Sequence, residues 1–459
     1  MKRDENGCSA IAPSSGASAV FAEGASTASG AGSTTEAAVP TTTTITYAYT
    51  TTVYATASAS ATPISTASSS GNSTEEASEL VSAAWYPDWL ENFTPANISW
   101  DKYTMVTYSF GMTTPDTSVI ELSNNTKLTE FVQVAHENNV TALISLGGWS
   151  GSRYFSSAVA TPENRTLFAQ TVMDLVTEYE LDGVDFDWEY PASNESQIGC
   201  NLFDSNDTAN FLLFLQELRQ ADCADDLILT AAVGSKPWLD ATGSPSTNVS
   251  DFAEVLDHIS IMAYDFAGSW SKTVGANAPL NASCADSSDA SSAMSSVELW
   301  NEAGFPLNQI VLGVASYGHS FSVASNTTLP ESGEITTFPA FSGTPKGDRL
   351  DSGAFTDVCG TTTETSGVFN FWGLIEEGYL TENGTVADGV QYTYDECTQT
   401  PFVYNETAGI MVSYDDATSF SAKGSYIAST GLGGFAMWQV SGDYNDILLE
   451  AIRSGMGAN

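Results

Sequence analysis

The stretch GVDFDWEY, residues 183–190, carries an acidic residue at every second position. Asp185, Asp187 and Glu189 alternate with apolar or aromatic residues, and a period of two predicts a β-strand with its carboxylates on one face. Burial and mutual repulsion on such a strand raise the pKa of at least one carboxyl group. One acid then stays protonated near neutral pH while another is ionised, which general acid catalysis requires.

Two other interpretations of the three acids are weaker. A solvated strand edge fits poorly because Phe186 and Trp188 separate the carboxylates. A calcium or magnesium site would also use carboxylates, but the stretch lacks a calcium-loop pattern with its glycine turn. The three histidines are scattered and no CxxC pair occurs, which argues against zinc. We therefore expect no metal and no cofactor.

Short apolar runs alternate with amphipathic segments from about residue 80 onward. The apolar faces of residues 164–183 and 207–220 recur with helical spacing. Eight strands alternating with helices predict a (β/α)8 TIM barrel, an α/β fold. A doubly wound open sheet is the alternative, but no GxGxxG follows the first strand. The expected strands are residues 81–86, 104–110, 141–147, 183–189, 228–233, 258–264, 309–317 and 433–440.

The chain divides by composition into three parts. Residues 1–79 are rich in Ser, Thr and Ala, and so few apolar residues predict a disordered stalk. The barrel is expected at residues 80–318 and 411–457. The gap between the seventh and eighth strands is too long for one crossover, and its aromatic and glycine-rich runs predict a small α+β insertion at residues 319–410.

The charge and the sequons indicate a secreted protein. Thirteen Lys and Arg stand against 56 Asp and Glu, giving a net charge of −43, which excludes nucleic acid as a partner. More than ten Asn-x-Ser/Thr sequons fit a secreted glycoprotein. No window reaches the roughly 18 apolar residues of a membrane span. A signal peptide is not visible, and we expect an incomplete or processed N-terminus.

The six cysteines allow several pairings in a secreted protein. Cys359 and Cys397 both lie in the insertion and are candidates for one disulfide. Cys200 and Cys284 follow the fourth and sixth strands and are candidates for another. A helix of about fifteen residues, roughly 22 Å long, separates Cys200 from Cys223 and argues against that pair. Cys223 is therefore expected to be free.

The stretch LDGVDFDWEY, residues 181–190, resembles the DxxDxDxE motif of family-18 glycoside hydrolases, the chitinases. Four further stretches resemble that family's strands in the same order, and the likeness covers about residues 80–455. The long insertion resembles one that builds a cleft wall in many chitinases of fungal type. The four stretches are SLGGWS (145–150), MAYDF (262–266), GVASYGHSF (313–321) and GLGGFAMWQV (431–440).

The resemblance implies retaining hydrolysis without an enzyme nucleophile, because the substrate's N-acetyl oxygen attacks the anomeric carbon to form an oxazolinium ion. Glu189 would be the general acid and then the base for water. Asp187 would bind the acetamido N–H, and Asp185 would share a proton with it. Tyr264 would donate to the acetyl oxygen. Asp182 is off the strand's parity and is interpreted as structural.

The resemblance also implies sugar contacts. Trp438 would stack on the sugar at the cleaved position, Asp265 would bind hydroxyls, and Met262 would form the pocket floor. His319 stands where the family commonly has Arg, so its contact to Asp265 or sugar is in question. Weaker substrate candidates are Tyr86, Phe110, Trp149, Trp270 and Tyr317. Residues assigned mainly to packing are Trp85, Trp89, Trp188, Trp372, Ser145, Gly147 and Gly148.

The function expected from this resemblance is a secreted, monomeric, endo-acting chitinase that hydrolyses β-1,4-N-acetylglucosamine linkages in chitin or N-acetylchitooligosaccharides. An endo-β-N-acetylglucosaminidase acting on N-glycans would share the motif and the mechanism. A non-catalytic chitin-binding lectin is a third reading, although relatives of that kind have usually lost the motif's final Glu. A metal-dependent hydrolase is a fourth, and it would lose activity in chelator.

Overall fold

The computed structural model describes residues 80–194, 200–221, 224–282, 291–328, 335–351, 353–363 and 365–458. The chain forms two units, Met1–Ser78 and Glu79–Asn459. The stalk predicted for residues 1–79 lies outside the described residues. Everything below concerns the second unit.

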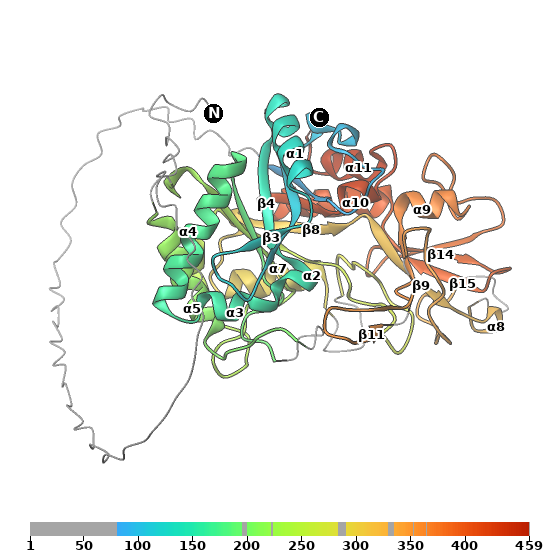
Figure 1. Cartoon of the computed structure of the whole chain (residues 1–459). Coiled ribbons are helices and arrows are strands. Elements are labelled where there is room, and N and C mark those ends of the chain that lie inside the picture. The colour runs from blue at the N-terminus through green and yellow to red at the C-terminus, as the bar shows by residue number, and fades with distance from the viewer. Residues whose placement is uncertain are drawn as a thin grey trace, which may run out of the picture. The chain divides into compact units, whose positions relative to one another are not determined.

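Eight parallel strands close into a barrel, as the sequence predicts (Figure 1). Each strand pairs with the next in the ring, and the first pairs with both the second and the last. The short strand β3 (Ile120–Leu122) adds antiparallel to β2. The barrel strands are β1 (Val81–Pro87), β2 (Met105–Thr113), β4 (Thr141–Gly147), β5 (Gly183–Asp187), β6 (Ile228–Val233), β7 (His258–Ile261), β8 (Ile310–Ala315) and β16 (Gly434–Trp438).

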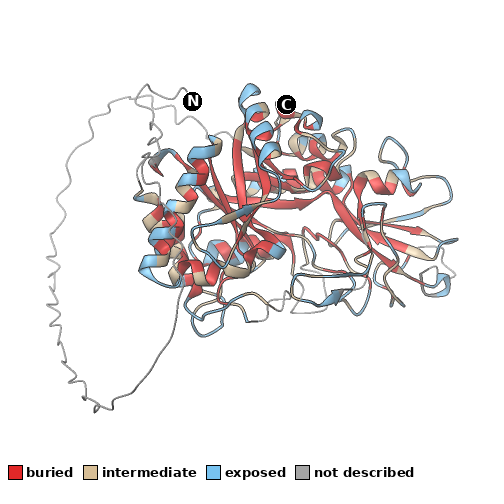
Figure 2. Ribbon diagram, in the orientation of Figure 1, coloured by how far each residue is buried: buried red, intermediate tan, exposed pale blue. Residues whose placement is uncertain are grey.

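Helices cover the outside of the barrel, and the longer ones bury their apolar sides against the strands (Figure 2). Helix α4, for example, is capped by the Thr161 hydroxyl, which accepts from the Asn164 amide at 3.2 Å, and has Pro162 in its first turn. The helices are α1 (Asn125–Glu137), α2 (Gly148–Gly151), α3 (Phe155–Val159), α4 (Pro162–Tyr179), α5 (Asp207–Arg219), α6 (Ser250–Ala253), α7 (Ala293–Glu302), α10 (Ala417–Thr430) and α11 (Ile447–Gly455).

Four of the predicted strands are shorter in the structure. Those expected at residues 309–317 and 433–440 span only Ile310–Ala315 and Gly434–Trp438, and the other two end early beside the site. The strand expected at residues 183–189 ends at Asp187, where its last pairing partner is Gly147. The strand expected at 258–264 ends at Ile261. Beyond these points the backbone bonds to other partners, and the amide of Glu189 donates to the Ser152 hydroxyl at 3.0 Å. Glu189, Tyr264 and Asp265 therefore stand on loops just past the sheet, at the carboxyl ends of the barrel strands, whereas Asp185 and Asp187 lie within β5.

The insertion between β8 and α10 is an antiparallel five-stranded sheet in the order β12-β9-β15-β14-β13. It extends to one side of the barrel in Figure 1. It begins with β9, directly after β8, because the chain passes from one sheet into the other across Ser316. Its elements are β9 (Tyr317–Ser322), α8 (Ser325–Thr328), β10 (Phe355–Thr356), β11 (Thr362–Thr363), β12 (Val368–Asn370), α9 (Phe371–Glu376), β13 (Gln391–Asp395), β14 (Thr400–Asn405) and β15 (Ile410–Ser413).

The disulfide pattern corrects both predicted pairings. Cys200 is bonded to Cys359, 159 residues away, so Cys359 does not pair with Cys397 and Cys200 does not pair with Cys284. The β10–β11 hairpin carries Cys359 out of the insertion to the loop that follows β5, a contact that sequence position does not reveal. Cys397 is itself disulfide-bonded. Cys223 and Cys284 lie outside the described residues.

Where the structure describes the chain, it contains no helix long and apolar enough to cross a membrane. Nor do the described side chains include a cluster of three or more His, Cys, Asp or Glu that could hold a metal ion.

A buried ion pair joins the exit of the insertion to helix α10. Lys423 Nζ contacts Asp415 Oδ2 at 2.6 Å, and both side chains are 1% exposed. Removing one partner of a buried pair leaves an uncompensated charge and costs about 3–5 kcal/mol. We expect Lys423→Met to lower the free energy of unfolding in denaturant by about that amount, and Lys346→Met, at an exposed lysine, to change it little. A loss below about 1 kcal/mol would contradict this role of the pair.

Candidate active site

Asp185 lies inside the barrel and is completely buried. Its Oδ1 accepts from the Thr230 hydroxyl at 2.6 Å, and its Oδ2 accepts from the Ser145 hydroxyl at 2.8 Å and the Trp85 indole at 3.1 Å. Burial raises the pKa of Asp185, and these three hydrogen bonds oppose the rise. Ser145 and Trp85, assigned above to packing, thus also act as donors to this carboxylate.

Asp187 is the next acid along β5 and is nearly as buried, with 4% of its surface exposed. Its pKa is raised well above the ordinary value by burial first, then by the charges of Glu189 and Asp185. Among the described residues, no donor reaches its Oδ1. A buried acceptor without a donor is costly, so this oxygen is prepared to accept a hydrogen bond from a bound molecule.

Glu189 stands past the end of β5 and is half-buried. Its pKa is raised to about 7, mainly by burial; a hydrogen bond from Tyr190 lowers the pKa, and the charge of Asp265 raises it. Its backbone is held at two points: its amide donates to Ser152 Oγ at 3.0 Å, and its carbonyl accepts from Asn201 Nδ2 at 2.9 Å. An acid with a pKa near 7 can both give and take a proton near neutral pH.

A second group of polar residues follows β7. Tyr264 is so placed that the charges of Asp187, Asp265 and Glu189 raise its phenolic pKa, after burial as the largest cause. Asp265 Oδ1 accepts from Tyr317 Oη at 2.7 Å and lies 2.8 Å from His319 Nε2. His319 therefore does contact Asp265, the contact that the sequence left in question.

Aromatic side chains gather beside the acids. Trp438 ends β16 half-buried, with its ring centroid 5.7 Å from that of Phe110 and 6.2 Å from that of Trp89. Trp89 and Phe110 are stacked with an interplanar angle of 12°. Trp438 also meets Trp85 edge-on, at 6.0 Å. This cluster joins the mouth of the barrel to the floor that contains Asp185.

Three tryptophans present large exposed surfaces. Trp89 is 51%, Trp149 45% and Trp270 56% exposed, and Trp270 meets the ring of His319 edge-on at 5.3 Å. The assignment of Trp89 to packing was therefore wrong, whereas Trp188 is buried as expected. Met262 is partly buried and packs against the same apolar cluster as Trp438.

Tyr86 does not reach the site, which corrects its assignment as a substrate candidate. Its side chain is fully buried, its ring stacks on Phe131 of α1, and its hydroxyl donates to the Phe93 carbonyl at 3.0 Å. Asp182 lies at the opposite end of β5, where Oδ2 accepts from the Ala142 amide at 2.9 Å. That contact agrees with a structural role for Asp182.

The glycines after β4 permit a close approach to the acids. A Cβ at Gly147 would lie 2.1 Å from the Asp187 carbonyl oxygen, and the residue has a φ of +111°. Gly148 is packed against the ring of Phe110 in the same way. These positions support the expected role of both glycines in strand and loop geometry.

Ser152, Asn201 and Tyr190 all contact Glu189 and were not identified from the sequence. Tyr190 adjoins Glu189 in the chain, and this adjacency was a usable signal. Ser152 and Asn201 lie on other loops, and nothing in their local sequence indicates the contact. Together the site offers a titratable acid, a buried acceptor, a phenol and aromatic platforms, which suits acid–base chemistry on a ring-containing ligand.

Comparisons with known proteins identify relatives of this chain. The family model described as glycosyl hydrolases family 18 matches residues 73–443. A protein called chitinase-like effector from Moniliophthora roreri is 46% identical over 83% of this chain and 94% of its own length. Chitinase A1 from Niallia circulans is 33% identical over 69% of this chain and 43% of its own.

The crystal structure of a chitinase from Rhizomucor miehei superimposes with a TM-score of 0.73 at 32% identity. The superposition covers 82% of this chain and all of that one. The barrel described above thus has a counterpart in an experimentally determined structure.

The influence of Asp265 on Glu189 can be measured without any substrate. We expect Asp265→Asn to lower the pKa of the Glu189 carboxyl below about 7, because a negative neighbour that disfavours ionisation is removed. Carbon-13 NMR titration of the glutamate carboxyls measures this pKa, and the signal that disappears in Glu189→Gln identifies the Glu189 carboxyl. Asp174→Asn, at an exposed aspartate of α4, should leave the pKa unchanged. An unchanged value in Asp265→Asn would show that Asp265 does not act on Glu189.

Proposed function

The chain belongs to glycosyl hydrolases family 18 and is a glycoside hydrolase of the chitinase kind, and from this membership we propose that it cleaves β-1,4-N-acetylglucosamine linkages with retention through the substrate's own acetamido group. The observation that carries the proposal is the series Asp185, Asp187 and Glu189. The first acid has three donors, the second has an oxygen without one, and the third has a pKa near 7.

In the first step, Glu189 protonates the glycosidic oxygen. Its pKa near 7 keeps a large fraction protonated at neutral and mildly acidic pH. The glycosidic bond breaks as the acetamido oxygen of the substrate attacks the anomeric carbon. The other sugar leaves with the proton as a free hydroxyl, and a cationic oxazolinium ion forms. Because the nucleophile is already part of the bound sugar, the attack is intramolecular and gains from proximity.

Asp187 orients the acetamido group through its free oxygen. The N–H of the substrate donates to Asp187 Oδ1, and the carboxylate then lies beside the positive ring. Tyr264, close enough to feel the charges of both Asp187 and Glu189, donates its hydroxyl to the acetyl oxygen. In the second step, Glu189 takes a proton from water, which opens the oxazolinium ion with overall retention.

The aromatic cluster supplies the sugar platform. Trp438 stacks on the sugar at the cleaved position, and the exposed Trp89 and Trp149 extend the platform along the barrel mouth. Asp265, half-exposed and held by Tyr317 and His319, binds sugar hydroxyls. An extended, endo-acting cleft fits this row of exposed rings. The Cys200–Cys359 disulfide supports secretion, since disulfides persist outside the reducing cytosol.

A second candidate is chitin binding without hydrolysis. It is favoured by the name chitinase-like effector carried by relatives from Moniliophthora roreri and Moniliophthora perniciosa, which are 46% and 45% identical. The acid series of this chain supports hydrolysis instead, because Glu189 and both aspartates are present.

Hydrolysis of a fluorogenic N-acetylchitooligosaccharide in chelator separates the two candidates. We expect the wild type to cleave it, and Glu189→Gln to lower kcat by about three orders of magnitude while still binding chitin, because the amide cannot donate the proton of an acid. Thr129→Ala, on the outer helix α1, is the control for handling and folding. A wild type that binds chitin without cleaving would establish the second candidate.

Participation of the acetamido group has its own test. Products followed by proton NMR should first appear as the β-anomer, and partly deacetylated oligosaccharides should be cleaved only after an N-acetylated sugar. Asp187→Asn should lower kcat by about a hundredfold or more with a smaller change in KM, because its charge acts on the cationic intermediate. Cleavage after a deacetylated sugar at the same rate would contradict the mechanism.

A further inference from the structure

The backbone of the general acid is held by two loops of different origin. Ser152 fixes the amide of Glu189 from the segment after β4, which is packed into the barrel. Asn201 fixes the carbonyl from the far end of the loop between β5 and α5. The contact from Asn201 needs a further explanation, because a long loop positions a side chain less firmly than a strand does.

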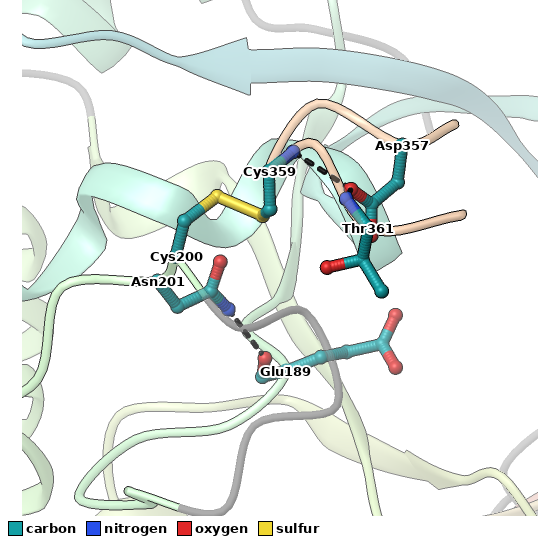
Figure 3. The surroundings of a disulfide bond; sticks show 6 residues. All are labelled: Glu189, Cys200, Asn201, Asp357, Cys359 and Thr361. Atoms are coloured by element: carbon teal, nitrogen blue, oxygen red, sulfur yellow. Dashed lines mark hydrogen bonds between the residues drawn. A yellow bond between two sulfur atoms is a disulfide. The ribbon is translucent and has the colours of Figure 1, made fainter. Parts of the chain in front are cut away.

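The residues on either side of Asn201 in the chain are both held by contacts to other segments. Cys200, immediately before it, is bonded to Cys359 of the insertion. Leu202, immediately after it, donates its amide to the Arg153 carbonyl at 2.9 Å. Figure 3 shows the amide of Asn201 directed at the carbonyl of Glu189, with the disulfide next to Asn201 and above it in the view.

The other end of the disulfide is also fixed. Asp357 Oδ1 accepts from the amides of Cys359 and Thr361, each at 2.8 Å, and the Asp357 amide donates to the Thr361 carbonyl at 2.9 Å. These bonds close the tip of the β10–β11 hairpin around the cysteine (Figure 3). The cross-link therefore joins the Glu189 loop to an ordered turn of the insertion.

From these contacts we propose that the Cys200–Cys359 disulfide and Asn201 form a strap, defined by these three residues, through which the insertion positions the backbone of Glu189 for proton transfer. The strap is a positioning device, since none of its residues is placed against substrate. The inference rests on the proposed function of Glu189 as general acid. It assigns to the insertion a role in catalysis itself.

The strap has two consequences that a purely structural disulfide lacks. Proton transfer requires the carboxyl at hydrogen-bond distance from the glycosidic oxygen, so a looser backbone lowers kcat more than it changes KM. Burial is the largest cause of the raised pKa of Glu189, so a loop that admits water shifts the alkaline limb of the kcat profile to lower pH.

The test compares Cys200→Ser/Cys359→Ser, Asn201→Ala and the triple variant in the full chain. We expect each of the first two to lower kcat by about threefold to tenfold, the scale of one hydrogen bond, with KM nearly unchanged and the alkaline limb at lower pH. Because the strap acts as one unit, the triple variant should lose no more than the double cysteine variant. Asp357→Ala should change kcat in the same direction.

Two kinetic results would overturn the strap. Cysteine variants with a lower melting temperature but wild-type kcat and pH profile at 25 °C would show a structural disulfide only. Losses that multiply in the triple variant would show that Asn201 and the disulfide act separately. Gln391→Ala, at an exposed amide on β13 of the insertion, serves as a matched control and should behave as the wild type.

The proposed function and the strap fail in different ways. If the wild type hydrolyses the oligosaccharide and Glu189→Gln does not, unchanged strap variants refute the strap alone. If the wild type does not hydrolyse it, hydrogen–deuterium exchange decides the strap without turnover: the peptide spanning Trp188–Pro191 should exchange at least severalfold faster in the cysteine variant, and peptides of β6 should not. Equal exchange of the Trp188–Pro191 peptide refutes the strap.

Discussion

The structure depends on the tolerance of a closed barrel for three carboxylates at one strand, two of them on β5 and the third just past its end. An isolated ionised carboxylate in an apolar interior costs far more than a domain's whole stability, so each acid needs a physical reason to be there. For Asp185 the reason is a set of donors from three other strands: Trp85 on β1, Ser145 on β4 and Thr230 on β6. The ring of strands therefore has to close around this side chain in one register.

The same constraint explains why hydrogen bonding and burial of the three acids decrease from the barrel floor to its mouth. Asp185 is satisfied by protein donors, Asp187 keeps one oxygen without a donor, and Glu189 is half-buried with a pKa near 7. The two acids closer to the cleft thus have fewer hydrogen-bond donors from the protein than Asp185 has. A bound acetamido group and a glycosidic oxygen can supply the missing hydrogen bonds. In this barrel, the reactivity arises from buried carboxyl groups whose hydrogen bonds the protein leaves incomplete.

The limits of the sequence as a guide follow from the same physics. Alternation of acids with apolar and aromatic residues predicted the strand β5 and the common face of its acids, but not whether that face points into the barrel. In β1 the residues of both faces are apolar, as is usual for a parallel strand buried on two sides, so period two could not separate inward Trp85 from outward Tyr86. The assignment of Trp89 to packing was wrong for a related reason: from sequence alone, a tryptophan after a strand can be either an exposed sugar platform or a core residue.

What no local pattern could reveal is how the insertion enters the site. Two of its features converge on Glu189 from different directions. Through β9 it supplies Tyr317 and His319, which hold Asp265 and with it the charge that raises the pKa of Glu189. Through the β10–β11 hairpin it supplies Cys359, whose disulfide reaches the loop that holds the backbone of Glu189. The environment of the acid is thus shared between two sheets, so changes in the insertion can tune both the proton affinity and the placement of Glu189 while the barrel floor stays as it is.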